Sequence, residues 1–182
     1  MRGKTIEIRE IERDDLAAVA RIIGAPDVLR YTTWKGPADT GAAERFVEMA
    51  QSSATAVPRV EYLLAIVDVG SGMVAGTGGI RIEDADTGVG SLRCLLHPDW
   101  WNRGIGTEAA RMAVGFGFET LGLSRIEADP ALENSPATAL LESAGLKRGE
   151  VRPGHHVAPD GTRRDSVAYA ITRDEWASPP RS

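Results

Sequence analysis

The chain has 182 residues, a length typical of one compact domain, and its hydrophobic share of 42% is sufficient for a sizeable core. The formal net charge of −5 argues against nucleic acid or an anionic membrane as the main partner, because phosphate binding requires a basic field. A single cysteine excludes an intrachain disulfide and favours a cytoplasmic location, and the sequence contains neither a membrane-spanning apolar run nor a metal-ligand spacing.

The first elements predicted along the chain are a strand and a helix. Residues 5–9 alternate in polarity as a short strand does. A helix is predicted from about Asp14, and Gly24 with Pro26 would end it. Its apolar residues follow the spacing of one helical face: Leu16, Val19, Ala20 and Ile23.

A second helix and an antiparallel meander come next. Asp39 or Thr40 is the expected N-cap of this helix. The helix has the same apolar spacing, at Ala43, Phe46, Val47 and Ala50. Three strands joined by short turns are then predicted, at residues 61–68, 73–83 and 90–97.

The second half of the chain alternates helices with strands. Gly145 follows the second of these helices, where a left-handed cap favours glycine. The predicted elements are a helix at 107–121, a strand at 124–129, a helix at 135–144 and strands at 146–155 and 164–172. The sequence therefore predicts an α/β (α+β) domain with a core at about 5–176, in which about four helices flank a mostly antiparallel mixed sheet of about seven strands.

The segment LLHPDWWNRGIGTEAA, residues 95–110, contains the most informative motif. Its glycines, Gly104 and Gly106, would let the backbone come close to a ligand, and Arg103 adds a positive charge. They open a predicted helix, whose first N–H groups have no internal partner and whose dipole is positive at that end. Such a terminus binds anions and suits a pyrophosphate.

A dinucleotide fingerprint competes with this interpretation. Gly104, Gly106 and Ala109 match G-x-G-x-x-A, and Asp129 stands where a ribose-binding acid would be expected. We reject a nicotinamide-dependent oxidoreductase because residues 97–103 separate the first glycine from its strand. The segment also follows an antiparallel meander instead of opening a βαβ unit. A glycine-rich loop that merely turns the chain is the remaining alternative.

The segment HPDWWNRGIGTEA resembles the coenzyme A loop of the GNAT superfamily of N-acetyltransferases, and in particular its ribosomal-protein (RimJ/RimL-like) branch. The resemblance extends over nearly the whole chain. In order, the other matching segments are IREIERDDLAAVARIIGAPDVLRYTTW, YLLAIVDVGSGMVAGTGGI, NSPATALLESAGLKRGE and RRDSVAYAITRDEW.

This resemblance implies a sheet splayed into a V, with acetyl-coenzyme A as the cofactor. The strand that ends at Leu95 would diverge from residues 124–129, and a backbone N–H near Leu95 would polarise the thioester carbonyl. Asn134 would contact the pantetheine arm and is the catalytic candidate. The full set of implied cofactor-binding residues is Leu95, Leu96, Asn102, Arg103, Gly104, Ile105, Gly106, Thr107 and Asn134.

Three positions depart from the family pattern. The fourth strand, GSLRCLL, has Ser91 and Arg93 where many members have a glutamate as general base. Ala137 replaces a serine expected to protonate the leaving thiolate, and Trp101 replaces the usual Gln or Arg of the loop. Four carboxylates could instead relay a proton through water, although for any one of them we favour a solvated surface role: Glu83, Asp84, Asp86 and Asp165.

The resulting prediction is an N-acetyltransferase in which an amine attacks the thioester directly in a ternary complex. The acceptor could be a protein N-terminus or a small-molecule amine. Tyr31 and Trp34 either line the acceptor pocket or pack the core. Because both expected proton-transfer residues are missing, a non-catalytic sensor of coenzyme A or acyl-coenzyme A remains an alternative. The family resemblance also suggests a possible homodimer.

Overall fold

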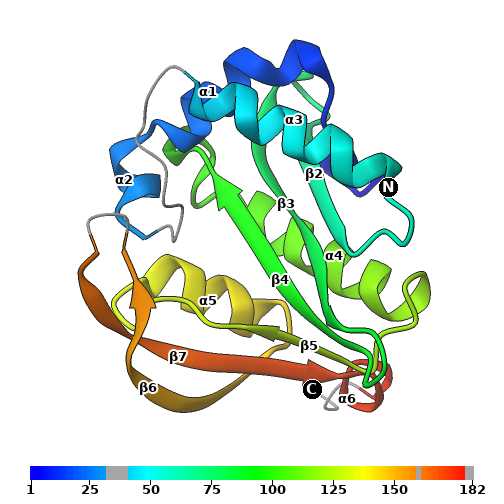
Figure 1. Ribbon diagram of the computed structural model, residues 1–182, viewed down its shortest axis with the longest axis vertical. Helices are drawn as coiled ribbons and strands as arrows, with labels where there is room; N and C mark the ends of the chain where they lie inside the picture. The colour runs from blue at the N-terminus through cyan, green and yellow to red at the C-terminus, as the bar shows by residue number, and fades with distance from the viewer. Residues whose placement is uncertain (32–40, 159–160, 179–182) are drawn as a thin grey trace.

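The computed structural model describes residues 1–31, 41–158 and 161–178 (Figure 1). One seven-stranded sheet, in the order β1-β2-β3-β4-β5-β7-β6, runs through it. The strands are β1 Ile6–Glu10, β2 Glu61–Asp68, β3 Val74–Asp84, β4 Val89–Leu96, β5 Arg125–Ala128, β6 Lys147–Val157 and β7 Arg163–Thr172. All neighbouring strands are antiparallel except β4 and β5, which are parallel. The predicted fold class and sheet are therefore confirmed.

Helices cover both faces of the sheet. Figure 1 shows α1 and α3 on one face, and α4 and α5 on the other. These four are the predicted helices, and their bounds are α1 Leu16–Ile23, α3 Ala42–Thr55, α4 Ile105–Glu119 and α5 Ser135–Ser143. Helix α4 begins two residues earlier than predicted, so the end of the glycine loop belongs to its first turn.

Two further short helices were not predicted. Pro26 does not simply end a helix; it opens α2 (Pro26–Leu29), since proline is favoured at a first helical position. Helix α6 (Arg173–Ala177) begins with a reciprocal capping box between Thr172 and Glu175.

The buried face of α1 differs from the prediction. Ile22 is fully buried, whereas Ala20 is exposed. A 3₁₀ turn at Arg13–Asp15 precedes the helix, α1 starts at Leu16, and its fully buried residues are Val19 and Ile22. In α3, Gly41 is the N-cap, and the predicted caps at 39 and 40 lie outside the described residues.

The core consists of layers on either side of the sheet. One buried cluster joins β2 and β3 to α1 and α3, through residues such as Val19 and Phe46. Two others join the sheet to α4 and α5, through residues such as Ile66, Val114 and Ile126. This packing fixes α4, and therefore its N-terminus, against the end of β4.

The sheet opens between β4 and β5. The two strands pair only from Val89–Ser91 to Arg125–Glu127. Beyond that point β4 continues along β3 as far as Leu96, whereas the chain after β5 follows β7. Val167 donates its N–H to the carbonyl of Pro130 at 3.1 Å, and Leu132 donates to Asp165 at 2.8 Å. This divergence, visible in Figure 1, is the V-shaped gap that the resemblance predicted.

Candidate active site

The free edge of β4 presents backbone groups to the gap. The N–H of His97 donates to the carbonyl of Ala75 on β3 at 3.0 Å. Because hydrogen-bonding directions alternate along a strand, the N–H of Leu95 also turns toward β3, and those of Cys94 and Leu96 turn toward the gap. Near Leu95, the N–H groups that face the gap are therefore those of Cys94 and Leu96.

The loop after β4 leads into the N-terminus of α4, where the first backbone N–H groups have no partner within the helix. Asn102 (φ 59°) and Gly104 (φ 76°) both have left-handed backbone conformations, which turn the loop into α4. The first bond of the helix runs from Glu108 N–H to Gly104 carbonyl at 3.0 Å. The N–H groups of Ile105, Gly106 and Thr107 precede that bond, and no side chain caps the helix.

The two glycines of the motif have different roles. A Cβ at Gly104 would meet nothing within 4 Å, so this position faces open space. A Cβ at Gly106 would lie 2.6 Å from Leu140 Cδ1 and 3.0 Å from Leu96 Cδ1. Gly104 thus leaves room for a ligand, whereas Gly106 lets α4 pack closely against α5 and β4.

Two tryptophans hold the loop in place. Trp101 Nε1 donates to the carbonyl of Leu96 at 2.9 Å, which ties the loop to the end of β4. Trp100 is buried, and the guanidinium of Arg103 lies 5.0 Å from the centre of its ring. Trp101, a departure from the family pattern in sequence, therefore has a structural role in the loop.

Asn134 begins the helix on the opposite side of the gap. Its side-chain oxygen accepts the N–H of Ala137 at 3.2 Å, as an N-cap does. That bond uses the amide oxygen and leaves Nδ2 as a donor without a partner among the described residues. Asn134 therefore combines a capping role with a polar group that can face a ligand.

The end of α2 meets β7 next to Asn134. Arg164 Nη1 donates to Glu133 Oε1 at 2.6 Å and to the carbonyl of Arg30 at 3.1 Å. The chain segments that hold Asn134 and Tyr31 therefore lie close together. Tyr31 is half-buried, with the Arg30 guanidinium 5.3 Å from its ring centre. Trp34, the other acceptor-side candidate, lies outside the described residues.

The face of the sheet under α1 and α3 has a row of paired charges beside β4. Ser91 Oγ donates to Glu83 Oε1 at 2.6 Å, and Arg81 lies 3.6 Å from the same carboxylate. Arg93 pairs with Glu61 on β2 at 3.2 Å. Each carboxylate here is held by an arginine, so none resembles a free general base.

Two of the other suggested proton relays have local structural roles. Asp84 accepts the N–H groups of Asp86 and Thr87 at 2.9 and 3.1 Å, which shapes the β3–β4 turn. The Thr87 hydroxyl, with these N–H groups, lowers the pKa of Asp84. Asp165 accepts the N–H of Gly154 at 2.9 Å, which holds an irregular part of β6.

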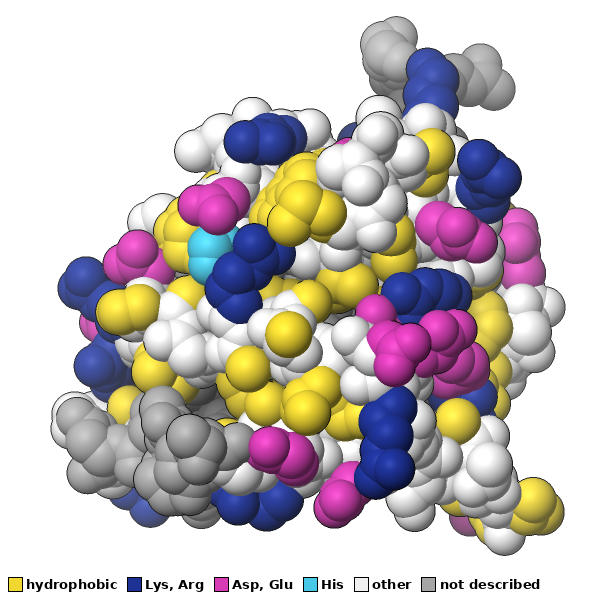
Figure 2. All heavy atoms as spheres, turned by 90° about the horizontal axis from the view of Figure 1, so that it is seen from above, with side chains coloured by type: hydrophobic (Ala, Val, Ile, Leu, Met, Phe, Trp, Pro, Cys, Tyr) yellow, Lys and Arg dark blue, Asp and Glu magenta, His cyan; other side chains and the backbone are white. Residues whose placement is uncertain are grey.

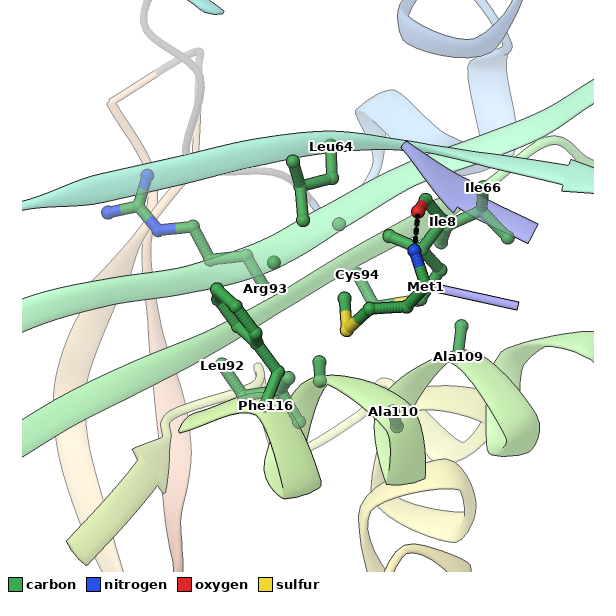
Figure 3. Close-up of a pocket in the computed structure, with 13 residues that line it drawn as sticks. Met1, Ile8, Leu64, Ile66, Leu92, Arg93, Cys94, Ala109, Ala110 and Phe116 are labelled. Carbon is green, nitrogen blue, oxygen red and sulfur yellow. Dashed lines mark hydrogen bonds between the residues drawn. The ribbon is translucent and has the colours of Figure 1, made fainter. Parts of the chain in front are cut away.

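A separate apolar pocket lies between the sheet and α4 (Figure 3). Its lining includes Met1, Leu64, Cys94 and Phe116. Burial raises the pKa of the Cys94 thiol to about 12, so the thiol is protonated at neutral pH. This pocket is thus part of the packing around α4, and Cys94 is not an activated nucleophile.

Positively and negatively charged side chains are intermixed on the surface shown in Figure 2, with hydrophobic side chains between them. Within the described part of the chain, no helix is long and apolar enough to cross a membrane, and no group of three His, Cys, Asp or Glu could hold a metal ion.

Comparisons with known proteins identify the family. The model of the GNAT acetyltransferase domain matches residues 5–147. The chain belongs to the GNAT acetyltransferase family. It is therefore an acyl-coenzyme A-dependent acetyltransferase, as the loop and the ordered matches predicted.

Relatives and solved structures match this acetyltransferase over nearly its whole length. An uncharacterized N-acetyltransferase p20 of Bacillus licheniformis is 23% identical over 94% of this chain and 95% of its own length. Mycobacterium smegmatis RimJ in complex with CoA-disulfide has a TM-score of 0.82 at 23% identity, over 97% of this chain and 85% of that one. Spermidine N-acetyltransferase of Vibrio cholerae, in complex with CoA and spermine, has a TM-score of 0.80 at 16% identity, over 96% and 99%. At these identities the two structures establish a shared fold.

The residues present fit coenzyme A. A pyrophosphate needs several donors that converge on unobstructed space, and the N–H groups before Glu108 together with the open side of Gly104 provide them. An extended arm with amide groups needs unpaired strand backbone, and the edge of β4 at Cys94 provides it.

Proposed function

We propose that this GNAT acetyltransferase transfers the acetyl group of acetyl-coenzyme A to a primary amine in a ternary complex. The observation that supports this most strongly is the gap between β4 and β5, which leads from unpaired strand backbone to the free N-terminus of α4. Bound there, coenzyme A would supply the acetyl group as a thioester, whose carbonyl carbon an amine can attack.

The chain's own groups would position and polarise the reactants. The N–H groups from Arg103 to Thr107 would bind the pyrophosphate, with Asn102 shaping the turn. The backbone of Cys94 and Leu96 would pair with the pantetheine arm, and one of their N–H groups would donate to the thioester oxygen as negative charge develops there. Asn134 Nδ2 would contact the arm from the other side of the gap.

Holding an amine next to the thioester provides much of the rate enhancement, because it turns an encounter of two molecules into a step within one complex. A thiolate is also a good leaving group, since the pKa of an ordinary thiol is about 8.5. The absence of a carboxylate on β4 and of a hydroxyl at Ala137 therefore does not prevent acetyl transfer.

The acceptor would enter from the side formed by α2, β6 and β7. The ion pair of Arg164 with Glu133 on that side favours an acceptor with polar groups besides its amine. A protein N-terminus and a small amine both satisfy this, and similar folds include both a ribosomal-protein-S5-alanine acetyltransferase of Vibrio fischeri and a spermidine N-acetyltransferase in complex with spermine.

A panel of amines tests the proposed function. The full chain would be incubated with acetyl-coenzyme A and either N-terminal peptides, polyamines or amino acids, and release of the thiol would be followed. Turnover with at least one class, at a rate well above hydrolysis, is the expected result. Tight cofactor binding without transfer to any amine would instead favour the alternative of a non-catalytic acyl-coenzyme A sensor.

A further inference from the structure

His156 on β6 is a buried imidazole with an unsatisfied nitrogen. The residue is only 5% exposed, and its Nε2 atom has no hydrogen-bond partner among the described residues. A buried polar atom without a partner is costly, and native structures keep few of them. Such an atom therefore indicates a position where a ligand or a water supplies the missing partner.

The strand partner of His156 connects it to both sides of the gap. His156 is the cross-strand partner of Arg164, whose guanidinium contacts both Glu133 and the carbonyl of Arg30. Glu133 directly precedes Asn134, the residue proposed to contact the cofactor arm, and Arg30 directly precedes Tyr31, the acceptor-side candidate. His156 thus pairs with the residue of β7 that contacts both of these segments.

We propose that His156 is the general base of this acetyltransferase and that its Nε2 atom takes a proton from the acceptor ammonium. This proposal rests on the proposed function, and it accounts for a family member whose β4 has no carboxylate.

The charge state of His156 suits this role. Desolvation by burial lowers its pKa, the positive charge of Arg164 and the neighbouring His155 lower it further, and Glu133 raises it. These are the charged groups that act on it from β7, from β6 and from the turn before α5. The imidazole is therefore neutral near pH 7, which is the form that can accept a proton.

The proposed step balances in atoms and charge. The ammonium gives one proton to Nε2, so that an imidazolium and a neutral amine form. The amine lone pair then makes the C–N bond while the C–S bond breaks, and the sulfur leaves as a thiolate with the bonding electrons. The nitrogen loses a second proton, which neutralises the thiolate, and the imidazolium returns its own proton to the solvent. The products are an amide, a thiol and one proton.

The test compares His156→Gln with His155→Gln, its exposed neighbour on the same strand. For an amine that the wild type acetylates, His156→Gln should lower kcat/KM at pH 7 by about 100-fold, the scale of general-base catalysis. The acidic limb of its pH profile should also disappear. His155→Gln should retain both. Affinity for acetyl-coenzyme A, measured by calorimetry, should not change in either variant.

A second measurement does not depend on the folding of a variant. The kcat/KM profile of the wild type should have an acidic limb whose apparent pKa equals that of the His156 imidazole, measured by NMR titration of the free protein. Loss of activity in His156→Gln with an unchanged acidic limb would overturn the proposal, and so would a limb that does not match the NMR value. A wild type that binds acetyl-coenzyme A but acetylates no amine would overturn the proposed function as well.

Discussion

On one side of the gap, the loop after β4 and the first turn of α4 present backbone N–H groups. On the other side, β6, β7 and the end of α2 present charged side chains. The first arrangement depends on backbone conformation over a few consecutive residues, such as the left-handed turn at Gly104. The second depends on contacts between distant parts of the chain, such as Arg164 with Arg30, which are 134 residues apart. The two sides should therefore respond differently to substitution.

The largest effect is expected where the two sides are joined. Ile126 is fully buried at the apex of the gap and pairs with Gly90 on β4 and Ile171 on β7. Ile126→Ala should lower the free energy of unfolding by about 2–5 kcal/mol, because the cavity cannot fully close. Urea denaturation measures this. Val151→Ala on exposed β6 is the control, with a change below about 0.5 kcal/mol. Equal losses in both variants would show that the apex does not join the two sides.

The sequence predicted the side of the gap formed by the loop after β4 and the first turn of α4 well, for a physical reason. Two glycines and a helix start lie within a few residues of each other, so local conformational preference was sufficient to place Gly104 and the N-terminus of α4. The role of Gly106 could not be predicted, because it depends on Leu140, which comes from another helix.

The sequence analysis did not predict most of the side-chain contacts on the other side of the gap, which is formed by β6, β7 and the end of α2. Adjacent histidines at 155 and 156 look alike in sequence, and only the fold buries one and exposes the other. The pair of Arg164 with Glu133 also forms only once distant segments meet. The sequence predicts that the N–H groups of β4 point alternately to its two sides. Which of them face the gap depends on the hydrogen bond of His97 to Ala75, which only the structure shows.

The next largest effect on stability would distinguish the packing role of Gly106 from the role of Gly104. Gly106→Val should lower stability by about 1–3 kcal/mol, because the added methyls collide with Leu140 and Leu96. Gly115→Val, in the same helix, is the matched control, since a Cβ there meets only Trp176 at 3.8 Å. Thermal unfolding should show a loss for the first variant alone. If Gly106→Val were as stable as its control, Gly106 would not be a packing residue.

A smaller effect distinguishes the two roles of Asn134. Asn134→Ala should cost about 1 kcal/mol of stability through loss of the N-cap, whereas Asn134→Asp should keep the cap. Both variants lose the Nδ2 donor and should bind acetyl-coenzyme A more weakly. Unfolding and calorimetry together measure this. Wild-type affinity for acetyl-coenzyme A in Asn134→Asp would show that the side-chain amide of Asn134 does not contact the cofactor.

The smallest effect on stability concerns pH. His156 has a lowered pKa in the folded chain, so between that value and about 6.5 the unfolded chain binds more protons, and stability falls as pH drops through that window. Arg164→Gln removes a positive charge that lowers this pKa, and the pKa should rise toward 6.5. The decline in stability should then become shallower. NMR titration of His156 checks the direction, and a pKa unchanged or lower in Arg164→Gln would contradict it.

Calorimetric titration with acetyl-coenzyme A tests the central claim, that the backbone around Gly104 holds the pyrophosphate. The wild type would be compared with Gly104→Glu and with Gly122→Glu. Both glycines have a left-handed φ, 76° and 73°, and open space beside them, so the two variants have matched backbone strain. We predict that the wild type and Gly122→Glu bind alike. Gly104→Glu should bind about 100-fold more weakly or not at all, since facing like charges cost several kcal/mol. Equal affinity in both variants, or no binding by the wild type, would contradict the account.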